Sequence, residues 1–261
     1  MLLLASAALA TALLVIAATF AVASRRRRYD IIDPVWGLGF AAIAVVTHVL
    51  ATPGTGVAAV VVPVLTVLWG VRLSLHLFAR NRGKPEDPRY QAILDRAGRW
   101  PRLRMFVRVY LVQALAMWFV SLPVQIAQVD LGGPRTPQAL LWFGTALWVV
   151  GMVFEGVGDE QLRRFRADPA NTGRVLDRGL WRYTRHPNYF GDACVWWGLF
   201  FAACHQAAGF ATALSPLLMT WLLAAGTGKP LLEQHLRQKR PEYADYLERT
   251  SGFLPLPPKK G

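Results

Sequence analysis

The residues richest in chemistry lie in one stretch of this chain, between Arg178 and Asp192. Cationic groups, an imidazole, a carboxamide, a phenol and a carboxylate occur there within fifteen residues, just before a long apolar run. Stopping a membrane helix at the lipid headgroups requires only the cations, so the other groups indicate a binding or catalytic site. The polar residues are Arg178, Arg182, Arg185, His186, Asn188, Tyr189 and Asp192.

The spacing of these groups predicts how a helix presents them. Pro187 has its φ angle already set for a first helical turn, so we expect the apolar helix to begin there. Asn188 and Asp192 then stand at i and i+4 on one face of that helix. The N-terminal end of a helix carries partial positive charge and free N–H groups, which favours an anionic ligand such as a phosphate.

Composition shows what kind of protein must position this stretch. Hydrophobic residues make up 54% of the 261 residues and charged residues only 17%, and the apolar residues gather in long blocks, which is typical of a membrane protein. The net charge of +13 is distributed as a membrane topology requires, so we expect no nucleic-acid partner. The two cysteines, Cys194 and Cys204, do not have the spacing of metal ligands, and no metal site is predicted.

The apolar blocks predict an all-α, polytopic fold with seven transmembrane helices. The last block is too long for one crossing, so we expect two helices joined by a tight turn near His205 and Gln206. The blocks cover residues 2–23, 31–51, 57–79, 105–126, 138–158 and 193–226.

The distribution of Lys and Arg predicts the orientation of these spans. Four segments, 25–30, 80–104, 159–192 and 229–261, hold 26 of the 29 basic residues, whereas the alternate loops hold only Arg135. Basic residues accumulate on the cytoplasmic side, so the N-terminus is expected outside, the C-terminus in the cytoplasm, and the polar stretch facing the cytosol.

Two further patterns fall inside the expected spans. Arg72, His76 and Arg80 form a stripe along the third span, and an inward-facing Arg72 is a functional candidate because charge within a membrane is costly. The alternative is that these side chains reach out to the headgroups. The sequence at 37–42 matches G-x-G-x-x-A, but it lies inside a span with no strand before it, so we interpret its glycines as sites of close helix packing.

The segment 159–192 contains seven arginines. Guanidinium groups suit bidentate recognition of phosphate, and a phosphorylated dinucleotide has three phosphates, whereas S-adenosylmethionine has none. The competing interpretation is that the topology alone demands about half of these arginines.

Two strings in this polar stretch resemble the signature of a known family. The strings Gly179-Leu180-Trp181-Arg182-Tyr183 and Arg185-His186-Pro187-Asn188-Tyr189-Phe190-Gly191-Asp192 are similar to the C-terminal signature of the steroid 5-alpha-reductase and sterol C14-reductase superfamily, and most closely to its small bacterial membrane branch. Further support comes from Asp33-Pro34-Val35-Trp36-Gly37, from Trp69 to Ser74, from Asn81 to Tyr90, and from the tail Lys229 to Tyr243.

The resemblance implies one membrane domain over residues 1–261 that binds NADPH from the cytosol. Residues 1–130 would provide the helices on the substrate side and residues 131–261 the cofactor-binding part. The expected cofactor contacts are Arg72, Asp159, Arg163, Arg166, Arg174, Tyr183, His186, Asn188, Tyr189, Asp192 and Trp196. The chain departs from the steroid reductases at Glu155, where they carry an Asn, and it lacks their N-terminal Gln-Glu pair and the tyrosine that polarises the steroid ketone.

The implied activity is NADPH-dependent reduction of an activated C=C bond in an apolar, steroid- or isoprenoid-like substrate, in the cytoplasmic membrane of a bacterium. A proton donor is then needed, and the candidates are Asp33, Glu86 and Tyr90. Each carboxylate has a plainer role open to it: Asp33 could cap the second helix, and Glu86 with Asp87 could pair with Arg89.

Two other functions stay open. The Arg-His-Pro-x-Tyr core also resembles isoprenylcysteine and phospholipid methyltransferases, which bind S-adenosylmethionine. The alternative is therefore a membrane methyltransferase, although Asn188 and the Gly191-Asp192 ending favour the reductases. A third possibility is a non-catalytic lipid-binding membrane protein.

Overall fold

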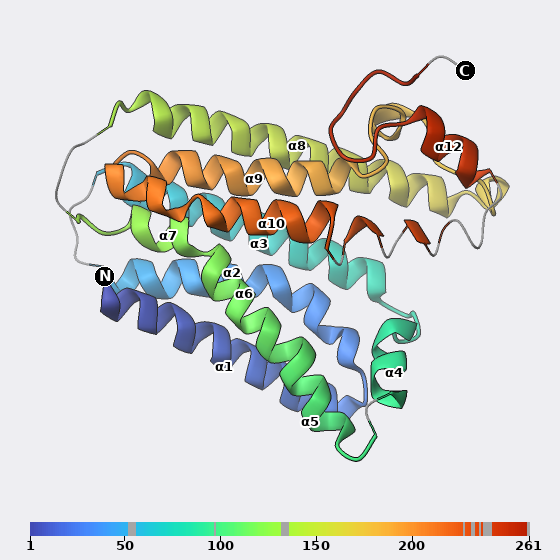
Figure 1. The fold of residues 1–261 in the computed structure, drawn as a ribbon, viewed down its shortest axis with the longest axis horizontal. Helices are drawn as coiled ribbons and strands as arrows, with labels where there is room; N and C mark the ends of the chain where they lie inside the picture. The colour runs from blue at the N-terminus through green and yellow to red at the C-terminus, as the bar shows by residue number, and fades with distance from the viewer. Residues whose placement is uncertain are drawn as a thin grey trace. The chain divides into compact units, whose positions relative to one another are not determined.

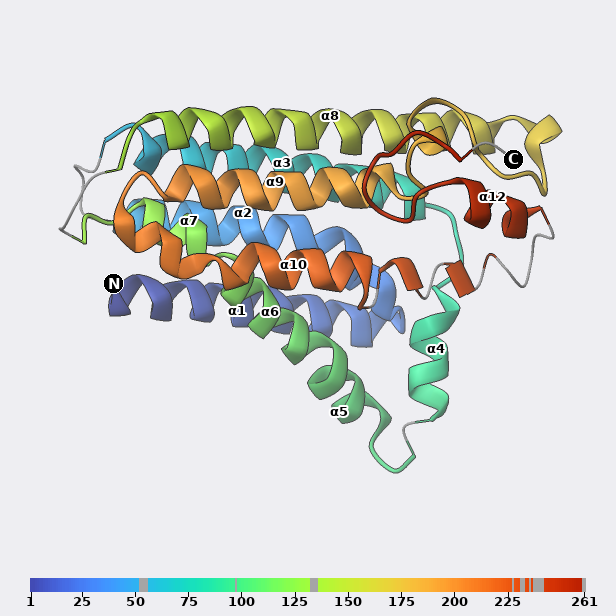
Figure 2. The same cartoon turned by 45° about the horizontal axis from the view of Figure 1, so that its top comes forward.

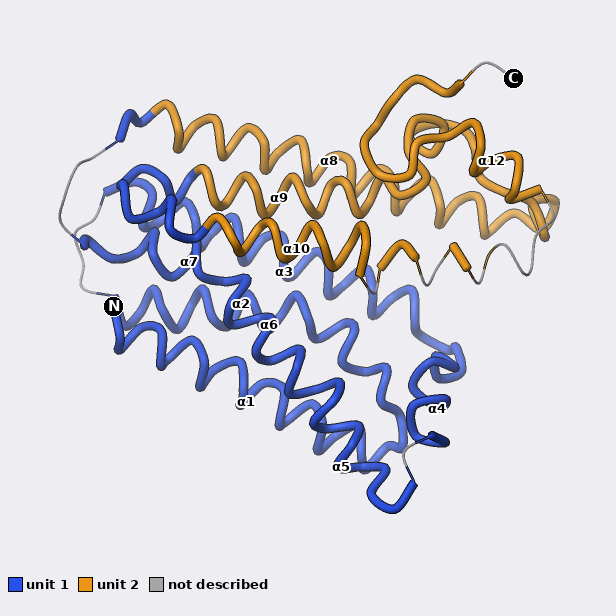
Figure 3. The backbone as a smooth tube through the Cα atoms, in the orientation of Figure 1, with its two compact units in different colours: residues 1–138, 202–212 blue, residues 139–201, 213–261 orange. Residues whose placement is uncertain are grey.

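A computed structural model describes residues 1–51, 56–96, 98–131, 136–226, 228–230, 233–234, 236 and 242–259. It is an α-helical structure, as predicted (Figure 1). The chain forms two compact units, each discontinuous in sequence (Figure 3). Unit 1 comprises residues 1–138 and 202–212, and unit 2 comprises residues 139–201 and 213–261.

The described residues contain six helical segments that are long and apolar enough to cross a membrane, which identifies a multi-pass membrane protein. Five of them coincide with the first five predicted blocks. The sixth predicted block divides into two helices around His205 and Gln206, as expected. Arg135, the one basic residue predicted in the outer loops, lies outside the described residues. The six segments are Leu2–Arg26, Tyr29–Leu50, Ala58–Asn81, Pro101–Ala127, Ala139–Ala167 and Ala207–Ala224.

Unit 1 is built on three long helices: α1 (Leu2–Arg26), α2 (Ile32–Leu50, preceded by the short turn η1, Tyr29–Ile31) and α3 (Ala58–Asn81). Helices α2 and α3 pack closely because glycines face each other. A methyl group at Gly37 would lie 2.3 Å from the Gly70 carbonyl oxygen, and Ser74 Oγ accepts a 2.9 Å hydrogen bond from the Leu38 amide. The packing interpretation of the 37–42 glycines is thereby confirmed.

The fourth predicted span is one continuous helical path with three changes of geometry. It runs from α5 through the π-helical η2 into α6 and then α7. The break before α7 falls at Ser121, two residues before Pro123, which has no N–H to continue the hydrogen-bond ladder. A short helix, α4, precedes this path. The bounds are α4 Pro88–Asp95, α5 Pro101–Met105, η2 Phe106–Leu111, α6 Val112–Val120 and α7 Leu122–Ala127.

The segment 202–212 completes unit 1 through hydrogen bonds to the end of α7. It contains the 3-10 helix η5 (Ala207–Thr212). The buried Gln206 side chain donates to the carbonyl oxygens of Ile126 and Val129 at 2.9 and 2.8 Å, and the Thr136 amide donates to the His205 carbonyl at 3.1 Å.

In unit 2, α8 (Ala139–Ala167), α9 (Pro187–Ala203) and α10 (Leu214–Ala224) run side by side in both views (Figures 1 and 2). The fifth predicted block ended at residue 158. That bound is wrong, because α8 continues without a break to Ala167. Two short 3-10 helices, η3 (Pro169–Asn171) and η4 (Gly179–Arg182), and α12 (Tyr243–Arg249) complete the unit.

A seam of glycines joins α8 to α9. A methyl group added at Gly151 would lie 2.5 Å from the Gly191 carbonyl oxygen, and one added at Gly198 would lie 2.6 Å from that of Gly144. Because the obstructing atoms belong to the backbone, the two helices can approach this closely only with glycine at these positions.

Candidate functional site

The glycine seam brings together two predicted cofactor residues from α8 and α9. At its end, Gly158 packs against Pro187, the first residue of α9. One residue further along each helix, Asn188 Nδ2 donates a 3.2 Å hydrogen bond to Asp159 Oδ1. Asp159 is buried and Asn188 half-buried, so this bond fixes a carboxylate and a carboxamide at the first turn of α9.

Further residues share the face of α9 that carries Asn188, as predicted from their spacing. Helix α9 begins at Pro187, so Asn188, Asp192 and Trp196 follow one another at successive turns. Asp192 and Trp196 are both buried, and Trp196 has no exposed surface. Two anion-attracting elements therefore meet here, the helix N-terminus and the amide of Asn188, next to two buried carboxylates that can accept hydroxyl or amide hydrogens.

Directly before α9, the buried His186 belongs to an ion-pair cluster. Glu233 Oε1 lies 2.9 Å from both Arg185 Nε and His186 Nε2. Burial alone would raise the pKa of the Glu233 carboxyl, but hydrogen bonds from His186 and Arg185 outweigh it and lower that pKa to about 2. Burial lowers the pKa of the His186 imidazole despite the nearby carboxylate. The geometry therefore assigns an uncharged ring that donates from Nε2.

The same cluster holds the C-terminal segment in place. Arg185 Nη1 donates to the Leu247 carbonyl at 3.0 Å, and the Arg185 amide donates to the Ser251 carbonyl at 2.9 Å. Thr184 Oγ1 donates to the Phe253 carbonyl at 2.9 Å, and the Leu256 amide donates to the Tyr183 carbonyl at 3.0 Å. We call residues 250–256 the C-terminal strap. His186, predicted as a cofactor contact, is engaged with Glu233 and also stacks on Tyr189, with ring centroids 5.2 Å apart.

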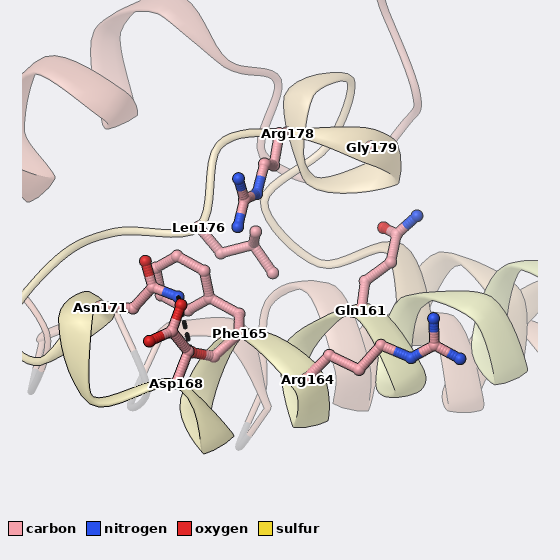
Figure 4. Close-up of a pocket in the computed structure, with 8 residues that line it drawn as sticks. All are labelled: Gln161, Arg164, Phe165, Asp168, Asn171, Leu176, Arg178 and Gly179. Carbon is pink, nitrogen blue, oxygen red and sulfur yellow. Dashed lines mark hydrogen bonds between the residues drawn. The ribbon is translucent and has the colours of Figure 1, made fainter.

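The segment between α8 and α9 forms a pocket of about 360 Å³ (Figure 4). Phe165 and Leu176 provide its apolar base, and the Arg178 guanidinium lies 5.9 Å from the Phe165 ring centroid. Gln161 holds the segment to α8, because its Oε1 accepts a 3.0 Å hydrogen bond from the Leu180 amide. The lining residues are Gln161, Arg164, Phe165, Asp168, Asn171, Leu176, Arg178 and Gly179.

The predicted arginine contacts fall into two groups. Arg163 forms an exposed ion pair with Glu160, whose other partner is Arg164. Arg166 and Arg174 are exposed on the same segment, and Tyr183 is 43% exposed beside the strap. Exposed ion pairs are weakly held, so Arg163 can exchange Glu160 for a phosphate.

Two residues of this region, Glu233 and Gln161, were not predicted as site residues. Glu233 carries the Arg185 and His186 interactions, and Gln161 and Arg178 help form the pocket. Arg178 was noted in the basic run without a specific role. No local pattern around Glu233 signals its partners, because 47 residues separate it from His186.

In unit 1, the three candidate proton donors lie around the start of α2. Tyr90 on α4 donates a 2.6 Å hydrogen bond to Asp33 Oδ1 in the first turn of α2. Glu86 accepts a hydrogen bond from the Tyr29 amide just before α2. The residues preceding α4 are thus tied to the entrance of α2, which sets Tyr90 against Asp33.

Of the plainer roles considered for the carboxylates, the structure confirms one part, the pairing of Asp87 with Arg89. Asp33 makes its hydrogen bond to Tyr90, and the α2 N-cap, Ile31, has no side-chain cap. It is Asp87, not Glu86, that pairs with Arg89, at 2.8 Å. Burial would raise the pKa of Asp87, but the hydrogen bonds from Arg89 lower it.

The phenol of Tyr90 stays protonated in this surrounding. Burial and the neighbouring Asp33 both raise the pKa of Tyr90 above its ordinary value. A phenol of raised pKa is a weak acid that keeps its hydrogen at neutral pH, so Tyr90 can donate a hydrogen bond. Arg72, also in unit 1, lies half-buried on α3 one turn before the half-buried His76, whereas Arg80 is exposed.

The described residues contain no group of three or more His, Cys, Asp or Glu side chains arranged to hold a metal ion. The predicted cofactor residues from Asp159 to Trp196 belong to unit 2. Asp33, Glu86, Tyr90 and Arg72 belong to unit 1.

The chain is similar in sequence to parts of several known proteins. The chain is 25% identical to an uncharacterized protein of Schizosaccharomyces pombe over 222 residues, which are 73% of this chain and 61% of that protein. It is 34% identical to human 3-oxo-5-alpha-steroid 4-dehydrogenase 1 over 120 residues, which are 45% of this chain and 42% of the human protein. The mouse protein of the same name is 43% identical over 61 residues, 23% of this chain and 24% of its own.

These matches cover less than two thirds of each relative, and no solved structure matches this chain. The family model for DUF1295, described as a protein of unknown function, matches residues 19–250. That range contains both the Asp33–Tyr90 contact and the whole of α8 and α9. Since it spans most of the sequence, the chain belongs to the DUF1295 family.

Proposed function

We propose that this protein is an NADPH-dependent membrane reductase that saturates an activated C=C bond in an apolar, steroid- or isoprenoid-like substrate. The observation that carries the proposal is the Asn188–Asp159 hydrogen bond at the start of α9, which sets the predicted cofactor residues on one face beside a basic segment. The partial similarity to 3-oxo-5-alpha-steroid 4-dehydrogenase 1 supports the same class of reaction.

The residues of unit 2 fit a phosphorylated dinucleotide. Asn188, Asp159 and Asp192 would bind hydroxyl and carboxamide groups, and Arg166 and Arg174 would bind phosphate. The pocket over Phe165 and Leu176, with Arg178 at its side, has the apolar base and the guanidinium against which the uncharged adenine ring of NADPH would stack. When bound, NADPH supplies the hydride that reduces the electron-poor carbon of the substrate.

The residues of unit 1 would supply the proton. Tyr90 would donate a hydrogen bond to the carbonyl oxygen conjugated to the C=C bond, so that negative charge developing on that oxygen is stabilised. In the structure the Tyr90 hydroxyl donates to Asp33 Oδ1. Once the phenol donates to the substrate, Asp33 in its acid form would donate to the Tyr90 oxygen instead and restore the phenol. The proton first held at the carbonyl oxygen would pass to the carbon next to the carbonyl as the enol returns to the ketone, so hydride and proton together add two hydrogens across the C=C bond.

We infer a topology of seven spans, with α9 as the sixth. Helix α9 has 17 residues, and it packs along its length on the spanning helix α8. The N-terminus is then outside, and the first turn of α9 faces the cytosol, where NADPH is found. An apolar substrate would enter from the lipid, because a sterol-sized molecule partitions there.

Methyl transfer from S-adenosylmethionine is the second candidate, and one observation favours it. Several arginines of the basic segment already have carboxylate partners: Arg163 and Arg164 with Glu160, and Arg185 with Glu233. The number of arginines that can bind phosphate is therefore lower than the seven in the sequence of this segment. S-adenosylmethionine has no phosphate and would need none of them.

The deciding experiment is a titration of the purified, detergent-solubilised protein with NADPH and, separately, with S-adenosylmethionine, followed by calorimetry and tryptophan fluorescence. We expect saturable binding of NADPH only, weakened at least about tenfold by Asn188→Ala, because a buried polar contact is lost. The matched control is Gln91→Ala, which removes an amide that also donates to an aspartate, Asp95 at 2.9 Å, but lies in unit 1 and has no role in the proposed cofactor site. Saturable binding of S-adenosylmethionine alone would replace the reductase by the methyltransferase.

A further inference from the structure

A basic and apolar surface lies between α4 and the fourth span, and no part of the proposed reaction uses it. Five exposed arginines occur there within thirteen residues, against one acidic residue, Asp95. None of the five has a carboxylate within 4.0 Å in the part of the chain that the structure describes. The arginines are Arg96, Arg99, Arg102, Arg104 and Arg108. We call residues 96 and 98–108 the arginine hairpin.

Large apolar side chains stand exposed among these cations. Trp100 is 60% exposed, Leu103 57% and Val107 44%. Their spacing, i, i+3 and i+7, places them along one side of the helical path that begins at Pro101. The Arg99 guanidinium lies 5.7 Å from the Trp100 ring centroid. An apolar stripe bordered by arginines, with a tryptophan at its end, is typical of a segment at a membrane surface.

The path of the chain gives the depth of this surface. Residues 101–127 form one candidate span, so Arg96 to Arg104 lie where that span leaves the hydrocarbon. Figure 2 shows α4 and α5 projecting from the α1, α2 and α3 helices of unit 1. The arginines therefore lie at the level of lipid headgroups, beside side chains suited to the acyl boundary.

We propose that the arginine hairpin is a binding surface for anionic phospholipids. Guanidinium groups bind phosphate in bidentate geometry, and five positive charges favour a headgroup with net negative charge over a zwitterionic one. A soluble acidic partner would leave Trp100, Leu103 and Val107 in water, whereas a lipid surface covers them. This surface is independent of the reductase proposal, since it uses none of the residues assigned there.

The test uses the full-length protein in nanodiscs of phosphatidylcholine alone or doped with phosphatidylglycerol. Brominated versions of each lipid quench nearby tryptophans, and the difference between the native protein and Trp100→Phe isolates Trp100. We expect stronger quenching by bromo-phosphatidylglycerol than by bromo-phosphatidylcholine, and loss of that preference in high salt, which screens surface charge. Equal quenching by the two lipids would overturn the proposal.

Charge variants make the test specific. Replacing Arg96, Arg99, Arg102 and Arg104 together with Gln should lower the preference for phosphatidylglycerol at least about tenfold, whereas the corresponding Lys variant should keep most of it. The control replaces Arg25, Arg26 and Arg27, three equally exposed arginines at the end of α1, with Gln. An equal loss in this control would show that any arginine near the membrane suffices, which contradicts a dedicated surface. If the fourfold Gln variant does not fold, Arg102→Gln with Arg104→Gln replaces it.

Discussion

At the scale of single residues, the contact between Tyr90 and Asp33 combines a donor and an acid from two helices that 57 residues of sequence separate. The sequence identified both residues as candidates without giving a reason for them to meet. The structure supplies the reason, because Glu86 binds the backbone just before α2 and thereby holds the start of α4 beside it.

If Tyr90 is the hydrogen-bond donor of the reaction, Tyr90→Phe should lower turnover of a steroid enone probe by at least about a hundredfold. NADPH affinity should not change, since Tyr90 is assigned to the substrate. The matched control is Tyr110→Phe, which also removes a buried phenol, one that donates to the Tyr29 carbonyl at 2.7 Å. Equal losses of turnover in the two variants would mean that Tyr90 acts only through stability.

Arg174 permits a second residue-scale prediction. If its guanidinium binds the 2′-phosphate of NADPH, Arg174→Ala should weaken NADPH binding roughly tenfold or more and leave NADH binding nearly unchanged, because only NADPH has that phosphate. Arg249→Ala, which removes an exposed arginine paired with Asp177, is the control. An equal loss of affinity for NADPH and NADH would show that Arg174 does not bind the 2′-phosphate and contributes only to the membrane topology. Calorimetric titration distinguishes these results.

At the scale of elements, the glycine seam between α8 and α9 is the feature that positions the candidate cofactor residues. Its signal is present in the sequence, since Gly144, Gly151 and Gly158 recur every seven residues, as do Gly191 and Gly198. Periodicity of small residues predicts a helix interface, although it does not identify the partner helix. The start of α9 at Pro187 was predictable from the proline alone, whereas the continuation of α8 to Ala167 was not, because charged residues at 159–166 resemble a loop after a span.

The seam predicts unequal effects of two alanine substitutions on the same helix. Gly151→Ala places a methyl group 2.5 Å from the Gly191 carbonyl oxygen and should lower the free energy of unfolding by roughly 3 kcal/mol, because backbone cannot yield cheaply. At Gly156 no atom lies within 4 Å of the added methyl, so Gly156→Ala should be neutral or stabilise by up to about 1 kcal/mol. Thermal unfolding in detergent measures both, and a similar loss in the two variants would contradict the packing described.

The strap held by Arg185 and His186 should loosen in acid. The folded pKa of His186 is lowered below its ordinary 6.5, so its contribution to stability is complete above pH 6.5 and is lost as the pH falls below it. Glu233, lowered from 4.5 to about 2, contributes fully above pH 4.5 and loses its contribution as the pH falls toward 2. Stability should therefore decline in two stages as the pH falls.

The His186→Gln variant separates the two stages. Glutamine retains an N–H donor toward Glu233 but does not titrate, so the decline that begins at pH 6.5 should flatten while the one below pH 4.5 stays. Proteolysis of the C-terminal segment, followed across pH, measures the release of the strap. An unchanged profile in the variant would show that other histidines cause the upper stage.

At the scale of the whole molecule, hydropathy predicted the membrane class and located five of the spanning helices within a few residues, except where α8 runs on. Helix α9 is shorter than these spans, with 17 residues, and it begins among polar groups. Interactions over long sequence distances, such as Glu233 with His186 or the strap with Thr184, leave no periodic trace, and no sequence pattern could have predicted them.

The seven-span topology predicts which fusions are active. A reporter enzyme that folds only in the cytosol should be active after Gly261 and inactive after residue 206, the turn between α9 and α10. If α9 did not cross, the reporter would be active after residue 206 and inactive after Gly261, because the chain would stay in the cytosol from residue 168 to residue 206 and α10 would then carry the C-terminus outside. The assay therefore tests the sixth span alone.

The eleven residues 202–212 bind to the end of α7, yet they are made after α8 and α9. During translation, unit 1 therefore stays incomplete until most of unit 2 has been synthesised. No single cleavage of the chain separates unit 1 from unit 2. Co-expressed fragments split at residue 138 can form both units only if residues 202–212 of the second fragment bind to the first fragment. During insertion into the membrane, a segment that is synthesised late therefore completes the unit that was synthesised first.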